Sequence, residues 1–158
     1  MSNKIVFNEY FKQLRGAKLS AVGRCANMAW LIFQRANGVM YSLHIQCPFR
    51  LTKENTILLA NGDMYVAVNQ VDDPLIDWDV NGINLFDKRA EVLPKEGDFV
   101  VCKVSISRYS DLCIRFENKS ILRVFISNSA DGEQWRLFEK SDSAKEHLVA
   151  YPLRIEFE

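Results

Sequence analysis

The segment SLHIQCPFR, residues 42–50, brings together several side chains that could take part in chemistry. It holds His44, one of two histidines in the chain, followed by Gln46, Cys47 and Arg50. Histidine titrates near neutral pH and can act as a general base or a metal ligand. A cysteine becomes a nucleophile when a base lies within reach. In a strand, however, His44 and Cys47 point to opposite faces, so they cannot pair without a bulge.

Polar and apolar side chains alternate along this segment. The polar set is Ser42, His44 and Gln46, and the apolar set is Leu43, Ile45 and Cys47. The alternation favours a half-buried strand whose apolar face belongs to the core, so we expect Cys47 to be buried. We expect partial cover over His44, with Trp30 and Trp78 packing on its face. Whether His44 is a binding residue or a structural one stays open at this point.

The segment DWDVNG, residues 77–82, resembles the start of an EF-hand calcium loop. The match ends there. The twelfth position of the loop needs a bidentate glutamate and is Lys88, and the eighth position is the polar Asn84. Asp and Asn also form turns by capping their own backbone. We therefore expect a turn that binds no calcium.

The sequence shows no known catalytic or cofactor motif. His44 and His147 lie far from each other and from any cysteine pair, whereas structural zinc sites use closely spaced ligands. There is no G-x-S-x-G, no P-loop and no G-x-G-x-x-G. We therefore predict no metal, no cofactor and no catalytic residue, and the sequence gives no support for an enzyme.

A second candidate region, EQWRLFEK at 133–140, precedes the histidine of HLV at 147–149. Trp135, Arg136 and His147 are residue types found at binding surfaces. In the competing interpretation Trp135 fills the core and Arg136 points to water. Together the two regions give the candidate binding residues: His44, Gln46, Arg50, Trp135, Arg136 and His147.

The elements that must position these residues are mostly strands. Residues 3–15 have the apolar spacing of an amphipathic helix ending at Gly16, and residues 83–93 fit a second, short helix. Asn37-Gly38 suits a two-residue type I′ hairpin, and residues 69–82 are loop-like. Short strands joined by tight turns pair antiparallel. We expect a mainly β α+β fold, a twisted antiparallel sheet curled at most into a half-barrel, with the N-terminal helix on one face.

Length and charge fit one soluble domain over residues 1–158. The 20 basic and 20 acidic side chains cancel, so the basic excess of a nucleic-acid binder is missing and we expect no nucleic-acid partner. No apolar run approaches the roughly 18 residues of a membrane span, and the N-terminus does not read as a signal peptide. We expect a cytoplasmic protein with its four separated cysteines reduced and buried; the oligomeric state is not indicated.

Several segments together resemble a family of small uncharacterised bacterial proteins. They are LHIQCPFR, DWDVNGINLFD, LRVFISNSADGE and EQWRLFE followed by HLVAY. The family has a similar L-H-x-Q-C-P-[WF]-R strand, a D-W-D loop, and E-x-W-R-x-F followed by H-[LF]-V. The resemblance spans most of the chain after residue 28. It implies a bacterial origin and a one-domain build, brings no assigned activity, and draws attention to Gln46, Arg50, Trp135 and Arg136.

Two functional hypotheses follow. The first is a non-catalytic interaction protein, such as an immunity or inhibitor protein that neutralises a protein partner. The second is a small-ligand-binding or enzymatic domain with a pocket around His44, Gln46 and Arg50. A pocket with converging polar groups would favour the second hypothesis, and a flat patch of aromatic side chains would favour the first.

Overall fold

The computed structural model describes residues 3–69 and 74–158. Its elements, in chain order, are α1 (Asn3–Leu14), β1 (Lys18–Cys25), β2 (Met28–Gln34), β3 (Met40–Ile45), β4 (Phe49–Lys53), β5 (Thr56–Ala60), the 3-10 helix η1 (Asn61–Tyr65), α2 (Leu85–Glu96), β6 (Val101–Ile106), β7 (Leu112–Phe116), β8 (Ser120–Val124), β9 (Trp135–Glu139), β10 (Leu148–Tyr151) and β11 (Arg154–Phe157). Both predicted helices are present. Four residues of the predicted 69–82 loop, 70–73, lie outside the described residues.

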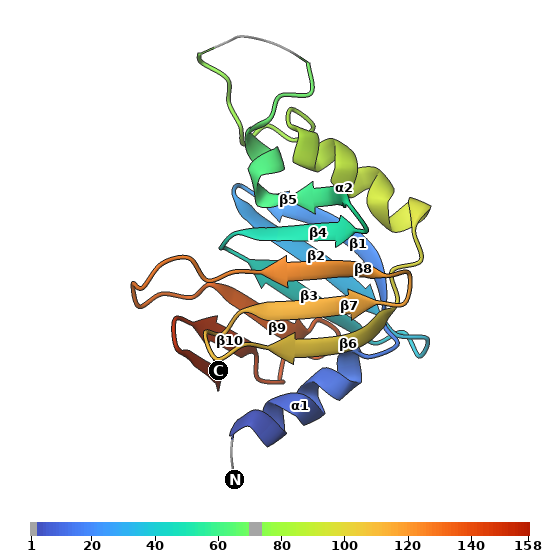
Figure 1. The fold of residues 1–158 in the computed structure, drawn as a ribbon, viewed down its shortest axis with the longest axis vertical. Helices are drawn as coiled ribbons and strands as arrows, with labels where there is room; N and C mark the ends of the chain where they lie inside the picture. The colour runs from blue at the N-terminus through green and yellow to red at the C-terminus, as the bar shows by residue number, and fades with distance from the viewer. Residues whose placement is uncertain (1–2, 70–73) are drawn as a thin grey trace.

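Two antiparallel sheets face each other across the core (Figure 1). The six-stranded sheet has the order β1-β2-β3-β9-β10-β11, and the five-stranded sheet has the order β5-β4-β8-β7-β6. Side chains from the facing sides are fully buried, among them Leu43 and Leu137 on one sheet and Leu51 and Ile114 on the other. The predicted mainly β, antiparallel fold with an N-terminal helix is confirmed. The strands form two sheets where one was expected, and neither closes into a barrel.

The segment 42–50, expected to be one strand, is divided between the two sheets. β3 ends in the six-stranded sheet, and β4 begins in the five-stranded sheet four residues later. The backbone N–H of Gln46 still donates to the Gln134 carbonyl oxygen at 2.8 Å. Pro48 has no N–H to continue the ladder. The chain therefore crosses from one sheet to the other between residues 46 and 48.

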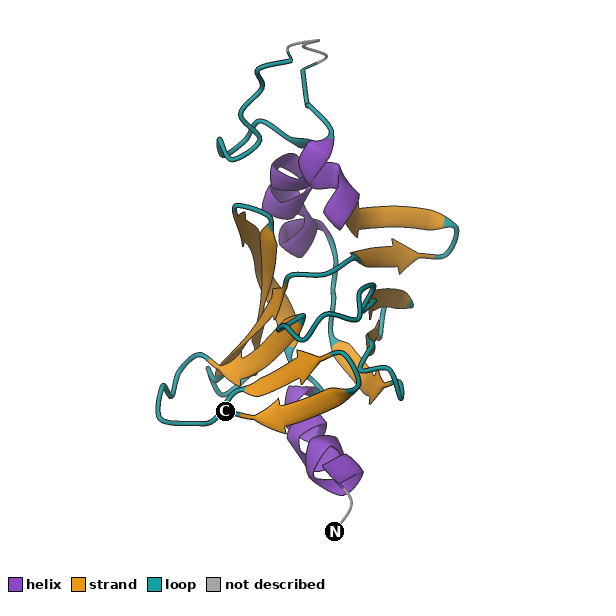
Figure 2. Ribbon diagram, turned by 90° about the vertical axis from the view of Figure 1, so that its left-hand side faces the viewer, coloured by secondary structure: helices purple, strands orange, loops and turns teal. Residues whose placement is uncertain are grey.

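The two helices close opposite ends of the space between the sheets (Figures 1 and 2). α1 buries Phe11 and Leu14 and packs against β6. α2 buries Phe86 and Leu93 and packs against the edge strands β1 and β5. Covering edge strands in this way prevents them from pairing with another chain. Because α1 and α2 lie at the ends, neither of them covers the outward side of a sheet.

The hairpin between β2 and β3 is present, but its turn differs from the prediction. The N–H of Arg35 donates to the Val39 carbonyl oxygen at 2.9 Å, which leaves a three-residue loop. Only Gly38 has a positive φ there, +89°, whereas a type I′ turn needs a positive φ at two central residues. The arrangement is a turn followed by a left-handed glycine bulge. The Asn37 side chain caps it by accepting a hydrogen bond from Val39 N–H at 3.0 Å.

The expectation that all four cysteines are buried is correct only for Cys47. Cys102 and Cys113 are half-buried, and Cys25 is exposed at the end of β1. All four are free thiols. In the described parts of the chain, no helix is long and apolar enough to cross a membrane.

Candidate functional site

The outer face of the six-stranded sheet, the side turned away from the core, holds half of the sequence-predicted candidates. Cross-strand pairing places Trp30 of β2, His44 of β3 and Arg136 of β9 in one row. Phe138 stands in the next row, opposite Ser42. Neither helix lies on this face (Figure 2). These side chains therefore point away from the core and are partly exposed to solvent.

Phe138 packs between the two histidines on this face. The His44 ring meets it edge-on, with ring centroids 5.0 Å apart and planes at 89°. The His147 ring stacks on it, with centroids 4.2 Å apart and planes at 12°. His147 precedes β10 and is held there by two backbone hydrogen bonds with Glu158, of 2.7 and 2.9 Å. Three half-buried rings thus form a cluster on the outer face.

Arg136 is fixed beside this cluster by a network of charged hydrogen bonds. Its Nε and Nη2 donate to the two carboxylate oxygens of Glu133, both at 2.6 Å. Its Nη1 lies 3.0 Å from Nδ1 of His147. Arginine can only donate, so Nδ1 accepts and the proton of the neutral imidazole sits on Nε2. The Glu158 carboxylate adds a weaker contact at 3.9 Å.

Both histidines are neutral at physiological pH. Burial lowers the pKa of His44 below its usual 6.5, and the nearby Arg136 guanidinium lowers it further. The pKa of His147 is lowered by the same two causes in the same order. The electrostatic character of the face at pH 7 is therefore set by the Arg136–Glu133 pair.

The other sequence-predicted residues lie apart from this cluster. Trp135 is fully buried, and its indole N–H donates to the Ser110 carbonyl oxygen at 2.8 Å, so it anchors the core. Gln46 is exposed just beyond the end of β3. Arg50 is exposed on the outward side of β4, in the other sheet. His44, Gln46 and Arg50 consequently do not line one common pocket.

Of the two tryptophans that were expected to pack on the face of His44, only one lies there. Trp30 pairs with His44 in the ladder between β2 and β3. Its ring also lies over Gly23 of β1, where a Cβ atom would overlap the ring. Trp78 instead meets Tyr65 edge-on, with centroids 6.1 Å apart. Only Trp30 belongs to the outer face.

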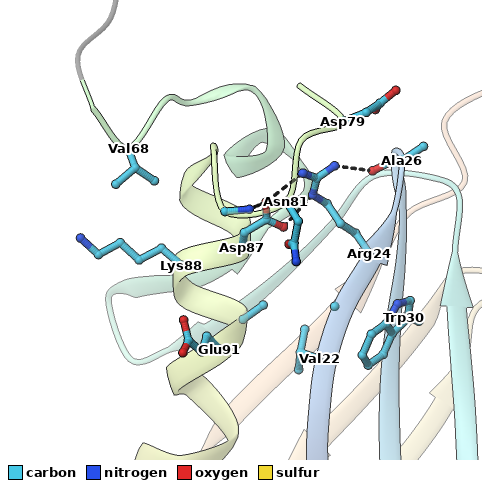
Figure 3. A pocket seen from close by; sticks show the side chains of 13 residues that line it. Val22, Arg24, Ala26, Trp30, Val68, Asp79, Asn81, Asp87, Lys88 and Glu91 are labelled. Carbon is cyan, nitrogen blue, oxygen red and sulfur yellow. Dashed lines mark hydrogen bonds and ion pairs between the residues drawn. The ribbon is translucent and has the colours of Figure 1, made fainter. Parts of the chain in front are cut away.

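A cavity of about 650 Å³ lies between β1, α2 and the loop that precedes α2 (Figure 3). Arg24 and Asp87 form a bidentate ion pair in its wall, at 2.7 and 2.8 Å, and their side chains are only 5% and 7% exposed. The guanidinium also donates to the carbonyl oxygens of Ala26 and Val80, at 3.0 and 3.1 Å. The pair therefore clamps the loop to β1, and its polar atoms are occupied within the protein.

Two carboxylates, one from the loop and one from α2, hold the backbone of the 77–82 loop. Asp77 accepts a hydrogen bond from the N–H of Asp79 at 3.0 Å, as in an Asx turn. Asp87 of α2 accepts one from Gly82 N–H at 2.8 Å. Gly82 has a φ of +86°, which this turn requires. Among the described residues, no group of three or more His, Cys, Asp or Glu side chains could hold a metal ion.

The Arg24–Asp87 clamp was not found from the sequence. The two residues are 63 positions apart, and no local pattern links them. One signal was available nearby. Asn84 accepts a hydrogen bond from Asp87 N–H at 2.9 Å and caps α2, and an Asn three residues before an acidic residue is typical of a helix start.

No protein-family model, no curated protein and no solved structure matches the chain.

Proposed function

We propose that the protein is a non-catalytic binding protein, of the immunity or inhibitor kind, and that the outer face of its six-stranded sheet contacts a protein partner. The observation that supports this most is the row of Trp30, His44 and Arg136, backed by Phe138, on a sheet face without a helix. An antiparallel sheet needs only one buried face. Tryptophan and arginine are enriched among residues that dominate binding energy.

The rigidity of Arg136 also supports the proposal. Glu133 and His147 hold its guanidinium in place before any partner arrives. Ordering a long side chain normally costs about 0.5–1.5 kcal/mol on binding, so a prearranged arginine avoids most of that cost. The guanidinium is still partly exposed, with 27% of its side chain accessible.

The arrangement favours binding over catalysis. In the described part of the chain, no hydrogen bond joins His44 to a hydroxyl, a thiol or a carboxylate. His147 Nδ1 is occupied by Arg136, and Cys47 faces the core. A histidine that acts as a general base must lie within or close to hydrogen-bond distance of the nucleophile.

The cavity between β1 and α2 supports a second candidate, binding of a small polar ligand. Its volume of about 650 Å³ is in the range of ligand sites. Asn81, Lys88 and Glu91 line it, and Trp30 provides an apolar wall. The Arg24–Asp87 pair, however, is satisfied internally, which removes its strongest polar groups from ligand binding. We therefore place this candidate second.

Site-specific photo-crosslinking tests the proposal. A photo-reactive benzoylphenylalanine replaces Gln46, which is exposed two residues beyond His44. The matched control carries it at Lys95, which is exposed in the last turn of α2. Both proteins are irradiated in the cells that normally make the chain. A discrete crosslinked protein is expected from position 46 only, and Trp30→Ala is expected to abolish it.

The same experiment can overturn the proposal. Equal products from positions 46 and 95 would mean adventitious capture. A product at position 46 that persists in Trp30→Ala at full yield would mean that the outer face does not carry the interaction. Absence of any product from position 46 would also contradict the proposal.

A further inference from the structure

The outward side of the five-stranded sheet, which faces the viewer in Figure 1, carries a row of cations. We call it the cationic array; it consists of Arg50 of β4, Arg123 of β8, Arg115 of β7 and Lys103 of β6. The three arginines alternate with buried core residues, as with Leu51 beside Arg50, and Lys103 is exposed directly opposite Arg115. The four side chains therefore leave the sheet on the same side.

The strand register arranges these four cations in a continuous line. Arg50 lies directly opposite Arg123, and Lys103 lies directly opposite Arg115. Arg123 pairs with Cys113, two residues before Arg115, so the two arginines are diagonal neighbours. Direct neighbours are about 5 Å apart and diagonal ones about 7 Å, which gives a line of roughly 17 Å across four strands.

No member of the cationic array forms an ion pair or a side-chain hydrogen bond within the described residues. The carboxylates of Asp111 and Glu117 stand beyond the two ends of β7. Like charges placed directly opposite in a sheet are destabilising. In a chain with zero net charge, such a grouping indicates a surface that is built for an anionic partner.

We propose that the cationic array binds a short acidic segment of a protein. The carboxylates of that segment would form ion pairs with the three guanidinium groups and the ammonium group. Arginine matches a carboxylate with two parallel hydrogen bonds. Two of the neighbouring outward residues are isoleucines, with Ile121 half-buried and Ile57 49% exposed. Protein side chains can pack on such residues. At about 3.3 Å per residue, five or six extended residues span the array.

Two observations favour an acidic protein segment over nucleic acid. No aromatic side chain stands at the ladder positions between the cations, so bases would lack the usual stacking platform. The protein is also neutral overall. A neutral protein lacks the overall basic excess that is expected of a nucleic-acid binder.

Fluorescence anisotropy tests this inference with defined probes. A labelled octaglutamate peptide is titrated with the full-length protein at about 50 mM salt, where surface charges are weakly screened. The same-length oligoglutamine and the oligonucleotide dT8 serve as comparison probes. Arg115→Gln and Arg123→Gln each remove one charge from the array. Lys95→Gln, in the exposed last turn of α2 and away from the array, removes one charge as the matched control.

Octaglutamate is expected to bind, and oligoglutamine is not. Arg115→Gln and Arg123→Gln are each expected to weaken octaglutamate binding about tenfold, the loss of one charge-assisted hydrogen bond, while Lys95→Gln binds like the wild type. Arg123→Gln is also expected to keep or raise the melting temperature, because it removes a like-charge pair. If Arg123 instead had a structural role, its replacement would lower the melting temperature.

Three results would overturn the inference: no binding of octaglutamate, equal weakening by Lys95→Gln and the array variants, or tighter binding of dT8 than of octaglutamate. The last would assign the array to nucleic acid. These results are separable from failure of the proposed function, because the array lies on the opposite sheet from the outer face that binds the partner in that proposal.

Discussion

At the scale of single residues, the protonation state of His147 decides whether Arg136 can donate a hydrogen bond to it on the outer face of the six-stranded sheet. His147 can accept a hydrogen bond from Arg136 only while Nδ1 is unprotonated. Protonation would place an imidazolium against a guanidinium. Glu133 and Glu158 act in the opposite direction, but burial and Arg136 dominate and lower the pKa of His147. The neutral form is thus the one that fits the folded protein.

Acidification is therefore expected to destabilise the protein through its histidines. Both have a folded pKa below 6.5, so the unfolded chain takes up their protons first. Their contribution to stability is complete above about pH 6.5 and is lost as the pH falls through the lower folded pKa values. Urea unfolding between pH 8 and pH 5 measures the loss. His147→Gln should lose less stability over this range than the wild type, and an identical loss would contradict the assignment.

Cys47 is expected to react slowly with thiol reagents in the native protein. Burial raises the pKa of its thiol to about 12, so almost no thiolate is present at neutral pH. Cys25 is exposed and should be modified first. Brief treatment with iodoacetamide, followed by peptide mass spectrometry, measures both sites. Labelling of Cys47 as fast as Cys25 would mean that Cys47 does not face the core.

At the scale of elements, the contact between β1 and β2 depends on a glycine. The Trp30 ring covers Gly23, and a Cβ atom at that position would overlap it. Gly23→Ala should therefore displace the ring at a cost of about 1–3 kcal/mol, the usual range for overpacking, and change the tryptophan fluorescence. In a Trp30→Ala background the same substitution should cost much less. Equal costs in the two backgrounds would show that the ring is not the obstacle.

The attachment of α2 and its preceding loop depends on the Arg24–Asp87 clamp. Asp87→Asn leaves the Arg24 charge buried without its counter-charge and should destabilise the protein by about 3 kcal/mol. The double variant Arg24→Met with Asp87→Leu removes both charges and should recover much of that loss. Chemical denaturation compares the three proteins. A single variant that costs less than about 1 kcal/mol, the range of a surface pair, would contradict the clamp.

At the scale of the whole molecule, periodicity predicted what depends on one strand or one helix at a time. The alternation of Leu43, Ile45 and Cys47 predicted which side chains of that segment are buried, and the apolar spacing of residues 3–15 predicted α1. The division into two sheets was not predictable in this way. A strand alternates identically in a single sheet and in a sandwich, because only one of its faces meets the core in either case.

The same limit explains the candidate site. Arg50 lies six residues from His44 in the sequence, yet the crossing at 46–48 sends it to the other sheet. Conversely, His44, Arg136 and His147 come together from distant segments, through pairings of β3, β9 and β10 that no local pattern encodes. The cationic array could not be predicted from the sequence for a similar reason. Overall composition gives a neutral chain, and only the strand register shows that four cations share one face.

The most direct test of the central claim is the affinity for the partner that crosslinks through position 46. Calorimetric titration of that purified protein compares the wild type, Trp30→Ala and Arg136→Gln with Arg108→Gln, an exposed arginine in the β6–β7 turn outside the outer face. If the outer face is the binding surface, each of the first two variants weakens binding about thirtyfold or more, the loss of a hot-spot residue, while Arg108→Gln binds like the wild type. Affinities of Trp30→Ala and Arg136→Gln within about twofold of the wild type, in variants that remain folded, would contradict the account.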